Sequence, residues 1–317
     1  MSSARNRRGL APTGRMLLAI AAMRKSVGRA FSVGRAGGVS SGIRAGNDGL
    51  GKPLARPGVV EAARSTPPES PPTSDDMMSF FLLRHGQTNF NAAGRIQGTL
   101  DTSVLTDVGI DQAVDVGKTL ASRADLNLGP TVIVSPMGRA QQTLSCVRDE
   151  FRNGGNSKDF EKVEVVHDIR EIELHEWQGE LIEDIKQRWP EEFAAWKADA
   201  MSFNIAGRYP ARDLWARAED AWQEILSLQS IQHQQRTLVV AHNAINQALV
   251  WTALGCDVSY FRKLSWPNCA VLELQWRRGQ NRAEGYRWVI PEPSPFIEAA
   301  DAATTMKQSK DDTRYTV

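Results

Sequence analysis

The apolar residues 80–83 are followed directly by Arg84, His85 and Gly86. Such a run predicts a buried strand, and open α/β sheets bind ligands at the carboxyl ends of their strands. A neutral imidazole can attack phosphorus, and a guanidinium can hold phosphate oxygens through two parallel hydrogen bonds. The glycine would let the backbone approach an anion. The stretch therefore predicts phosphoryl chemistry with His85 as nucleophile, but a lone tripeptide is weak evidence and needs its context.

Strand and helix signals alternate between residues 77 and 291. We expect strands at 78–83, 131–134, 162–166, 237–241, 269–275 and about 285–290, and helices at 107–122, after Ser135, and at 244–254. Thr106 suits the N-cap of the first helix, and Pro136 the first position of the second. Residues 181–229 read as helical and interrupted at 207–210. The pattern predicts an α/β fold, a three-layer α/β/α sandwich with a mainly parallel, mixed sheet. Residues 181–229 would form a helical cap over one sheet edge.

The two ends of the chain differ in composition from this domain. Residues 1–47 contain nine basic residues, and the first acidic residue is Asp48. A segment rich in Arg, Ser, Ala and Gly and free of acid is typical of an organelle transit peptide. A basic arm for nucleic acid or anionic lipid and a secretory signal with its apolar core at 16–23 are the alternatives. Residues 48–76 read as a disordered linker rich in Pro, Ser and Gly, and 292–317 as a mobile tail.

Composition sets limits on partners and cofactors. The 317 residues carry a net charge of +1, which predicts no bulk attraction to nucleic acid or to a membrane surface. No segment is long and apolar enough to cross a bilayer. The cysteines Cys146, Cys256 and Cys269 have neither metal-ligand nor redox spacing. We therefore expect no structural zinc and a reducing compartment, and the oligomeric state stays open.

Polar side chains follow four of the expected strands. They are Arg84 and His85 with Asn91, Gln97 and Gly98 further on, Arg139 after the second strand, Glu171 after the third, and His242 after the fourth. Taken singly, these residues have ordinary interpretations, as a helix-surface arginine, a solvated glutamate with Glu173 and Glu176 as competitors, and a structural histidine. Taken together and in this order, they predict one site.

Phosphoryl transfer explains why these residue types occur together. Charge builds up on the equatorial oxygens, so electrostatic stabilisation dominates catalysis. Two arginines and one protonated histidine could supply it, and the dipole of the helix that begins near Arg139 would face the same anion. Neighbouring positive charge would keep His85 neutral and nucleophilic. Glu171 could give its proton to the leaving alkoxide. Side chains supply the cations, so no metal or cofactor is expected.

At this point the sequence resembles the histidine phosphatase superfamily, also called phosphoglycerate mutase-like. The matching stretches are Arg84-His85-Gly86-Gln87-Thr88 with Asn91, Gly94-Arg95-Ile96-Gln97-Gly98, Leu105-Thr106 with Gly109 and Gln112-Ala113, Ser135-Pro136 with Arg139-Ala140 and Gln142-Thr143, Arg170-Glu171-Ile172, Trp177-Gln178-Gly179, and Val239-Val240-Ala241-His242. The resemblance implies that His85 is the phosphohistidine nucleophile and Glu171 the proton donor. Arg84, Arg139 and His242 would complete the phosphate pocket. It also implies further substrate contacts from Asn91, Gln97 with Gly98, and the backbone N–H of Asn243.

Residues 203–215 and 241–249 resemble the plant and cyanobacterial branch of this superfamily, which includes chloroplast phosphatases of 2-carboxy-D-arabinitol 1-phosphate. The resemblance implies a phosphorylated sugar or sugar acid as substrate and the plastid stroma as location, with the mitochondrion as alternative. The chain departs from many relatives at His175 and Asn243-Ala244, where they carry glycines. Arg208 and Arg212 would suit a second anion on the substrate.

Three functions fit these residues. A phosphatase would pass the phosphoryl group from His85 to water. A mutase would return it to another hydroxyl and would have to exclude water, which a mobile tail does not favour. A non-catalytic binding module on the same fold is the third. The presence of all the named groups favours the phosphatase.

Overall fold

The computed structural model describes residues 76–154, 160–232, 235–291, 294–295 and 297–299. The presequence expected at 1–47 lies outside the described residues. So do residues 48–75 of the expected linker and 300–317 of the expected tail.

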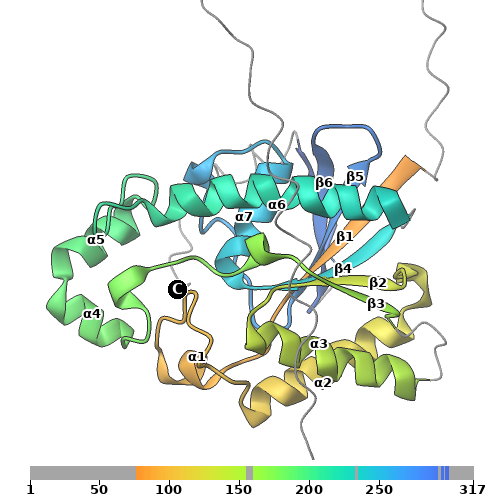
Figure 1. Ribbon diagram of the computed structural model, residues 1–317, viewed down its shortest axis with the longest axis horizontal. Coiled ribbons are helices and arrows are strands. Elements are labelled where there is room, and N and C mark those ends of the chain that lie inside the picture. The colour runs from red at the N-terminus through yellow and green to blue at the C-terminus, as the bar shows by residue number, and fades with distance from the viewer. Residues whose placement is uncertain (1–75, 155–159, 233–234, 292–293, 296, 300–317) are drawn as a thin grey trace, which may run out of the picture. The chain divides into compact units, whose positions relative to one another are not determined.

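The described strands form one mixed sheet of seven strands (Figure 1). They are β1 (Met77–Arg84), β2 (Thr131–Val134), β3 (Lys162–Val165), β4 (Arg236–Ala241), β5 (Val271–Arg277), β6 (Ala283–Ile290) and β7 (Ile297–Glu298), in the order β3-β2-β4-β1-β5-β6-β7. The pairs β2–β3, β2–β4 and β1–β4 are parallel, and the pairs β1–β5, β5–β6 and β6–β7 are antiparallel. Because Arg84 of β1 is in register with Ala241 of β4, His85 and His242 leave the sheet side by side.

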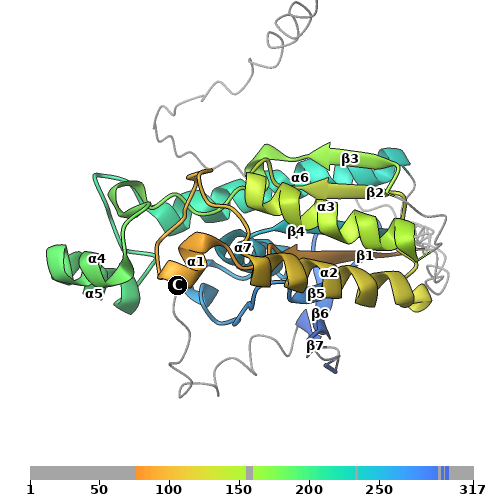
Figure 2. The same cartoon turned by 90° about the horizontal axis from the view of Figure 1, so that it is seen from below.

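Helices cover both faces of the sheet (Figures 1 and 2). They are α1 (Asn89–Ala93), α2 (Asp107–Ser122), α3 (Gly138–Asn153), α4 (Ile182–Arg188), α5 (Pro190–Ala198), α6 (Pro210–Gln232) and α7 (Asn243–Ala253). Alternate residues of a strand face opposite sides. Thus Phe80 and Leu82 belong to a core shared with α6 and α7, and Phe81 and Leu83 to one shared with α2 and α3. The expected three-layer sandwich is confirmed.

Two helix starts test the capping expectations. The Thr106 hydroxyl accepts a hydrogen bond from the Gly109 N–H over 3.0 Å, so Thr106 is the N-cap of α2 as expected. The second helix differs, because α3 begins at Gly138 with Met137 as its N-cap. Asp101 Oδ1 accepts from the Gly138 N–H over 2.6 Å and fixes this start. The prediction that Pro136 occupies the first helical position is therefore wrong.

The expected cap over residues 181–229 is in fact two structures. The short helices α4 and α5 extend beyond the end of the sheet, whereas the long helix α6 lies along a sheet face beside α7 (Figure 1). The Trp222 ring of α6 packs at 5.0 Å from the Phe80 ring, and its Nε1 donates to the Leu249 carbonyl over 2.8 Å. Because α6 carries this buried apolar stripe, it belongs to the core layer and not to the cap.

The sheet extends past the expected domain end at residue 291, because Ile297 and Glu298 pair with Tyr286 and Gly285 of β6. In the part of the chain that is described, no helix is long and apolar enough to cross a membrane.

Candidate active site

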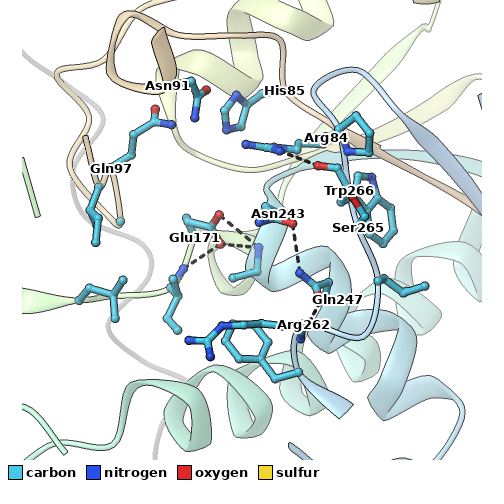
Figure 3. Close-up of a pocket in the computed structure, with 18 of the residues that line it drawn as sticks. Arg84, His85, Asn91, Gln97, Glu171, Asn243, Gln247, Arg262, Ser265 and Trp266 are labelled. Carbon is cyan, nitrogen blue, oxygen red and sulfur yellow. Dashed lines mark hydrogen bonds between the residues drawn. The ribbon is translucent and has the colours of Figure 1, made fainter. Parts of the chain in front are cut away.

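A cavity of about 300 Å³ lies at the carboxyl ends of β1 and β4. Figure 3 shows Arg84, His85 and Asn91 on one side of it, Glu171 and Asn243 near its centre, and Arg262 on the opposite side. The structure brings eight of the expected site residues into its lining, namely Arg84, His85, Asn91, Gln97, Gly98, Arg139, Glu171 and Asn243. His242 lies fully buried beside them, with its ring 5.1 Å from that of His85.

The His85 imidazole is held in one tautomer. Its Nδ1 lies 2.8 Å from the Gly86 carbonyl oxygen, which can only accept, so Nδ1 carries the proton. Nε2 then holds a lone pair, and among the described residues no group is hydrogen-bonded to it. Burial, and then the charges of Arg139 and Arg84, lower the pKa of His85 well below its usual value. The imidazole is therefore neutral and nucleophilic at Nε2.

Gly86 meets a different steric demand from the one expected. A Cβ at Gly86 would lie 2.4 Å from the Gly109 carbonyl oxygen, and one at Gly109 would lie 2.0 Å from the Gln87 carbonyl oxygen. The two glycines thus let the loop after β1 pack against the first turn of α2. Close approach of the backbone to an anion is not needed to explain Gly86.

Arg84 is a cation buried in the wall of the cavity. Its Nη1 donates to the Trp266 carbonyl over 2.5 Å, and its Nε is buried and has no hydrogen-bond partner within the described ranges. Burial lowers the pKa of Arg84 to about 10, an effect that the Glu171 charge opposes. At neutral pH the guanidinium remains charged and keeps a donor for an anion.

Arg139 is fixed by three acceptors. Its Nη1 and Nη2 donate to the Leu100 and Gly98 carbonyls over 2.9 and 2.8 Å, and its Nε donates to His242 Nδ1 over 3.2 Å. The first amide of its helix is already bound by Asp101. Gly98 thus orients Arg139 through its carbonyl. The expectation that the dipole of this helix faces the substrate anion is not met, because a carboxylate occupies that helix end.

His242 uses both ring nitrogens. Nδ1 accepts from Arg139, and Nε2 lies 2.7 Å from the Ser135 hydroxyl oxygen. Burial, and then the charge of Arg139, lower the pKa of His242 well below its usual value. The expectation of a protonated histidine at this position is therefore wrong for the free protein, since Arg139 already supplies a positive charge at Nδ1.

Glu171 closes the N-terminus of α7. Its Oε1 accepts from the amides of Ile172, Ala244 and Ile245 over 3.0 to 3.2 Å (Figure 3). The bonds to Ala244 and Ile245 satisfy amides that the start of α7 leaves without partners. They also aim the carboxyl group into the cavity, where it can exchange a proton with a leaving group.

Asn91 and Gln97 have their carbonyl oxygens engaged on the protein. Asn91 Oδ1 accepts from the Thr88 backbone N–H over 3.1 Å. Gln97 Oε1 accepts from the hydroxyls of Thr88 and Ser103 over 2.9 and 2.8 Å. Each amide group therefore has its NH₂ donors left for the cavity, which suits the binding of phosphate oxygens.

The two arginines expected to hold a second anion are not brought to this cavity. Arg208 and Arg212 are exposed, and the Arg212 guanidinium stacks on Tyr209 and donates to the Met201 carbonyl over 2.7 Å. The cavity lining instead includes Arg262, which sequence reasoning missed. It lies in a loop without periodic pattern, and its basic charge next to an aromatic residue was the one available signal.

Comparisons with known proteins agree with this geometry. The family model of the histidine phosphatase superfamily (branch 1) matches residues 80–289. The chain is 38% identical over 195 residues to a probable 2-carboxy-D-arabinitol-1-phosphatase of Arabidopsis thaliana and 37% identical over 196 residues to 2-carboxy-D-arabinitol-1-phosphatase of Triticum aestivum. Each alignment covers 62% of this chain but 37% and 36% of the relative, so the chain spans little more than a third of their length.

Other relatives are matched over nearly their full length. The chain is 30% identical over 229 residues to a probable phosphoglycerate mutase of Erwinia tasmaniensis, an alignment that covers 72% of this chain and 97% of the relative. A solved mycobacterial glucosyl-3-phosphoglycerate phosphatase in complex with VO3 is 25% identical with a TM-score of 0.56, over 68% of this chain and all of that one. The alpha-ribazole phosphatase from Shigella flexneri shares the fold, with 23% identity and a TM-score of 0.53 over 65% and 93% of the chains.

Proposed function

This chain belongs to the histidine phosphatase superfamily, branch 1, and from that premise we propose that it is a metal-independent phosphatase of a small phosphorylated sugar or sugar acid. The observation that carries the proposal is the His85 tautomer. Because Nδ1 is bound to the Gly86 carbonyl, the neutral ring presents its Nε2 lone pair to a cavity lined by Arg84 and Arg139. A nucleophile beside two fixed cations is the arrangement that phosphoryl transfer requires.

The reaction runs in two steps. In the first, Arg84, Arg139 and the amide groups of Asn91 and Gln97 hold the phosphoryl oxygens, and His85 Nε2 forms a bond to phosphorus as the ester P–O bond breaks. The leaving alkoxide takes the proton of Glu171. In the second step, water gives its proton to Glu171 and attacks phosphorus, and the N–P bond breaks to release inorganic phosphate.

The proposed substrate is 2-carboxy-D-arabinitol 1-phosphate or a close analogue. Support comes from the names of the two plant relatives, which are 38% and 37% identical to this chain. The name of a solved relative, a glucosyl-3-phosphoglycerate phosphatase, further supports a phosphorylated sugar acid as the class of substrate.

The proposed location is the plastid, with the mitochondrion as alternative. The nine basic residues within 1–47, the absence of acid there and the plant source of these relatives support it. A fusion of residues 1–76 to a fluorescent protein tests it in leaf cells. We expect fluorescence that coincides with chlorophyll, and a diffuse signal would contradict the proposal.

A mutase is the second function to test, because the near-full-length relative is named a probable phosphoglycerate mutase. Its activity would appear as conversion of 3-phosphoglycerate into 2-phosphoglycerate without phosphate release.

A phosphate-release screen of the full chain separates these functions. The panel holds sugar phosphates, bisphosphates, sugar-acid phosphates and phosphoglycerates, each with and without EDTA, with His85→Ala as control. We expect release that is insensitive to EDTA and lost in the variant. Isomerisation without release would favour the mutase, and neither activity on any compound would favour a binding module.

A further inference from the structure

The cavity has a second cationic end, formed by Arg262 on the side opposite Arg84 and His85 (Figure 3). We propose that Arg262 binds a second anionic group of the substrate, a carboxylate or a second phosphate, while its phosphoryl group lies at His85. This inference rests on the proposed function and assigns the part of the site that selects the substrate.

The backbone of Arg262 is anchored to the N-terminal half of α7, near the centre of the cavity. Its N–H donates to Gln247 Oε1 over 2.9 Å, and Gln247 Nε2 donates to Asn243 Oδ1 over 3.1 Å. Asn243 opens α7, the helix whose N-terminus Glu171 occupies. Arg262 itself takes a left-handed backbone, with φ of 67°. These hydrogen bonds therefore fix the position of the Arg262 backbone relative to α7 and Glu171.

The Arg262 side chain is held by the cap. Its guanidinium carbon lies 4.1 Å from the centre of the Trp196 ring of α5 and 5.1 Å from that of Phe261. Its Nη1 donates to the Trp196 carbonyl over 2.8 Å, and its Nη2 is buried and has no acceptor among the described residues. A stacked and anchored guanidinium has already lost most of its conformational freedom, so little more is lost when an anion binds.

The charge of Arg262 has no acidic partner in the part of the chain that the structure describes. Among the described residues, none of the ion pairs involves Arg262, whereas Arg188 of the same cap pairs with Glu180 over 2.6 Å. Burial lowers the pKa of Arg262 to about 10, so the group stays charged at neutral pH. The same positive charge, after burial, lowers the pKa of the neighbouring Lys197. A partly buried cation without a partner is costly, and an anionic ligand would offset that cost.

The carboxylate that does line the cavity is already engaged. Glu171 is held by the amides of Ala244 and Ile245. The residues around Arg262 carry no acidic group, since Leu264 and Phe261 are apolar, Gln247 is a neutral amide and Lys197 is basic. The cavity therefore has hydrogen-bond donors for a phosphoryl group at one end and the proposed proton donor, Glu171, in the middle. At the other end it has the cation of Arg262, which has no acidic partner among the described residues. A phosphate monoester with one further anionic group fits this order.

The test is a comparison of affinities for matched compounds. Isothermal titration calorimetry on the full chain in the His85→Ala background avoids turnover. The pairs are 2-carboxyarabinitol 1-phosphate with arabinitol 1-phosphate, and 3-phosphoglycerate with glycerol 3-phosphate. The carboxylate replaces a hydrogen in the first pair and an uncharged CH₂OH group in the second. We expect the carboxylated member of at least one pair to bind tenfold to a hundredfold more tightly, and Arg262→Gln to reduce this preference to less than threefold.

Three controls keep the result decisive. Arg188→Gln removes an arginine that is stacked on Trp189 in the same cap but lies outside the cavity, and it should keep the preference. Arg262→Lys, which keeps a cation without the planar fork, should keep part of it. Melting temperatures of all variants report on folding, and if Arg262→Gln does not fold, the Arg262→Lys result decides.

Equal affinity for both members of both pairs in the His85→Ala protein would overturn the inference, as would an unchanged preference in a folded Arg262→Gln variant. Hydrolysis of p-nitrophenyl phosphate by the chain with His85 intact is measured in parallel. If this protein does not hydrolyse p-nitrophenyl phosphate, the proposed function is contradicted. The binding preferences measured in the His85→Ala background would still decide the role of Arg262.

Discussion

Arg139 donates a hydrogen bond from its guanidinium Nε to Nδ1 of His242 over 3.2 Å. Because guanidinium nitrogens can only donate, Nδ1 of His242 must be unprotonated and Nε2 must carry the proton that the Ser135 oxygen accepts. His85 has the opposite tautomer, with its proton on Nδ1. The two imidazole rings lie 5.1 Å apart. They differ in hydrogen bonding, because both ring nitrogens of His242 are engaged, whereas Nε2 of His85 has a free lone pair.

The different tautomers predict unequal effects of substitution. His85→Asn should lower kcat for p-nitrophenyl phosphate by about a thousandfold or more, because the nucleophile is lost. His242→Gln should cost less, since an amide oxygen can still accept from Arg139 and its NH₂ can still donate to Ser135. Steady-state kinetics on folded variants checks this. Equal losses in the two variants would contradict the assignment of roles.

Stability should fall in mild acid because of the two buried histidines. Burial lowers the pKa of both His85 and His242 well below 6.5, whereas in the unfolded chain they bind protons near 6.5. Below pH 6.5 the unfolded state therefore binds more protons, and the free energy of unfolding decreases as pH falls. Each histidine contributes a slope of about 1.4 kcal/mol per pH unit in this window.

Urea unfolding at pH 7.5, 6.5 and 5.5 measures this slope. Between pH 6.5 and 5.5, His242→Gln should show a smaller loss of stability than the unmodified protein, because one of the two linked protons is gone. His167 is exposed, so His167→Gln provides the control. If the free energy of unfolding depends on pH with the same slope in all three proteins, protonation of the buried histidines does not cause the loss of stability.

Glu171→Gln should affect substrates according to their leaving groups. An alkoxide needs a proton as it leaves, so kcat for a sugar phosphate should fall about a hundredfold to ten-thousandfold. The p-nitrophenolate ion leaves without a proton, so its phosphate ester should be affected far less. The amide oxygen of the variant can still accept from the α7 amides. Glu173→Gln, at a carboxylate that is 48% exposed, is the matched control, and a loss that is equal for both esters would exclude Glu171 as the proton donor.

Gly86 and Gly109 should be intolerant of alanine. A Cβ at either position would come within 2.4 Å of a backbone carbonyl oxygen of the other loop segment, and such overpacking costs about 1–3 kcal/mol. Gly154→Ala is the control, because its nearest neighbour would lie at 3.3 Å and its φ is negative. Thermal unfolding should show lower melting temperatures for Gly86→Ala and Gly109→Ala and little change for the control. Unchanged melting temperatures at all three positions would contradict this packing argument.

Local sequence patterns are sufficient to predict the core of this fold. The apolar strands around residues 80–83 and 237–241 and the N-cap at Thr106 all depend on short-range periodicity and capping, and the structure has each of them. The proposed catalytic side chains follow directly from strand ends, which is why the sequence predicts that Arg84, His85 and His242 lie together.

Features that depend on tertiary contacts were not predictable in this way. The helical pattern of α6 gives no sign of whether its apolar stripe faces a sheet or a cap, and its packing on Phe80 decides the matter. The start of α3 depends on Asp101, from a distant loop. Arg262 enters the cavity because its loop folds back onto Trp196 and Gln247, a contact that no local pattern encodes.

The most direct test of the account is to look for phosphate on His85. The full chain is mixed with its best substrate, quenched in alkali within milliseconds and digested for mass spectrometry. We predict a phosphorylated peptide that contains His85, labile to acid, formed before steady-state phosphate release and absent from the His85→Asn variant. Phosphate release with no phosphohistidine, or a label on His242 instead, would contradict the account.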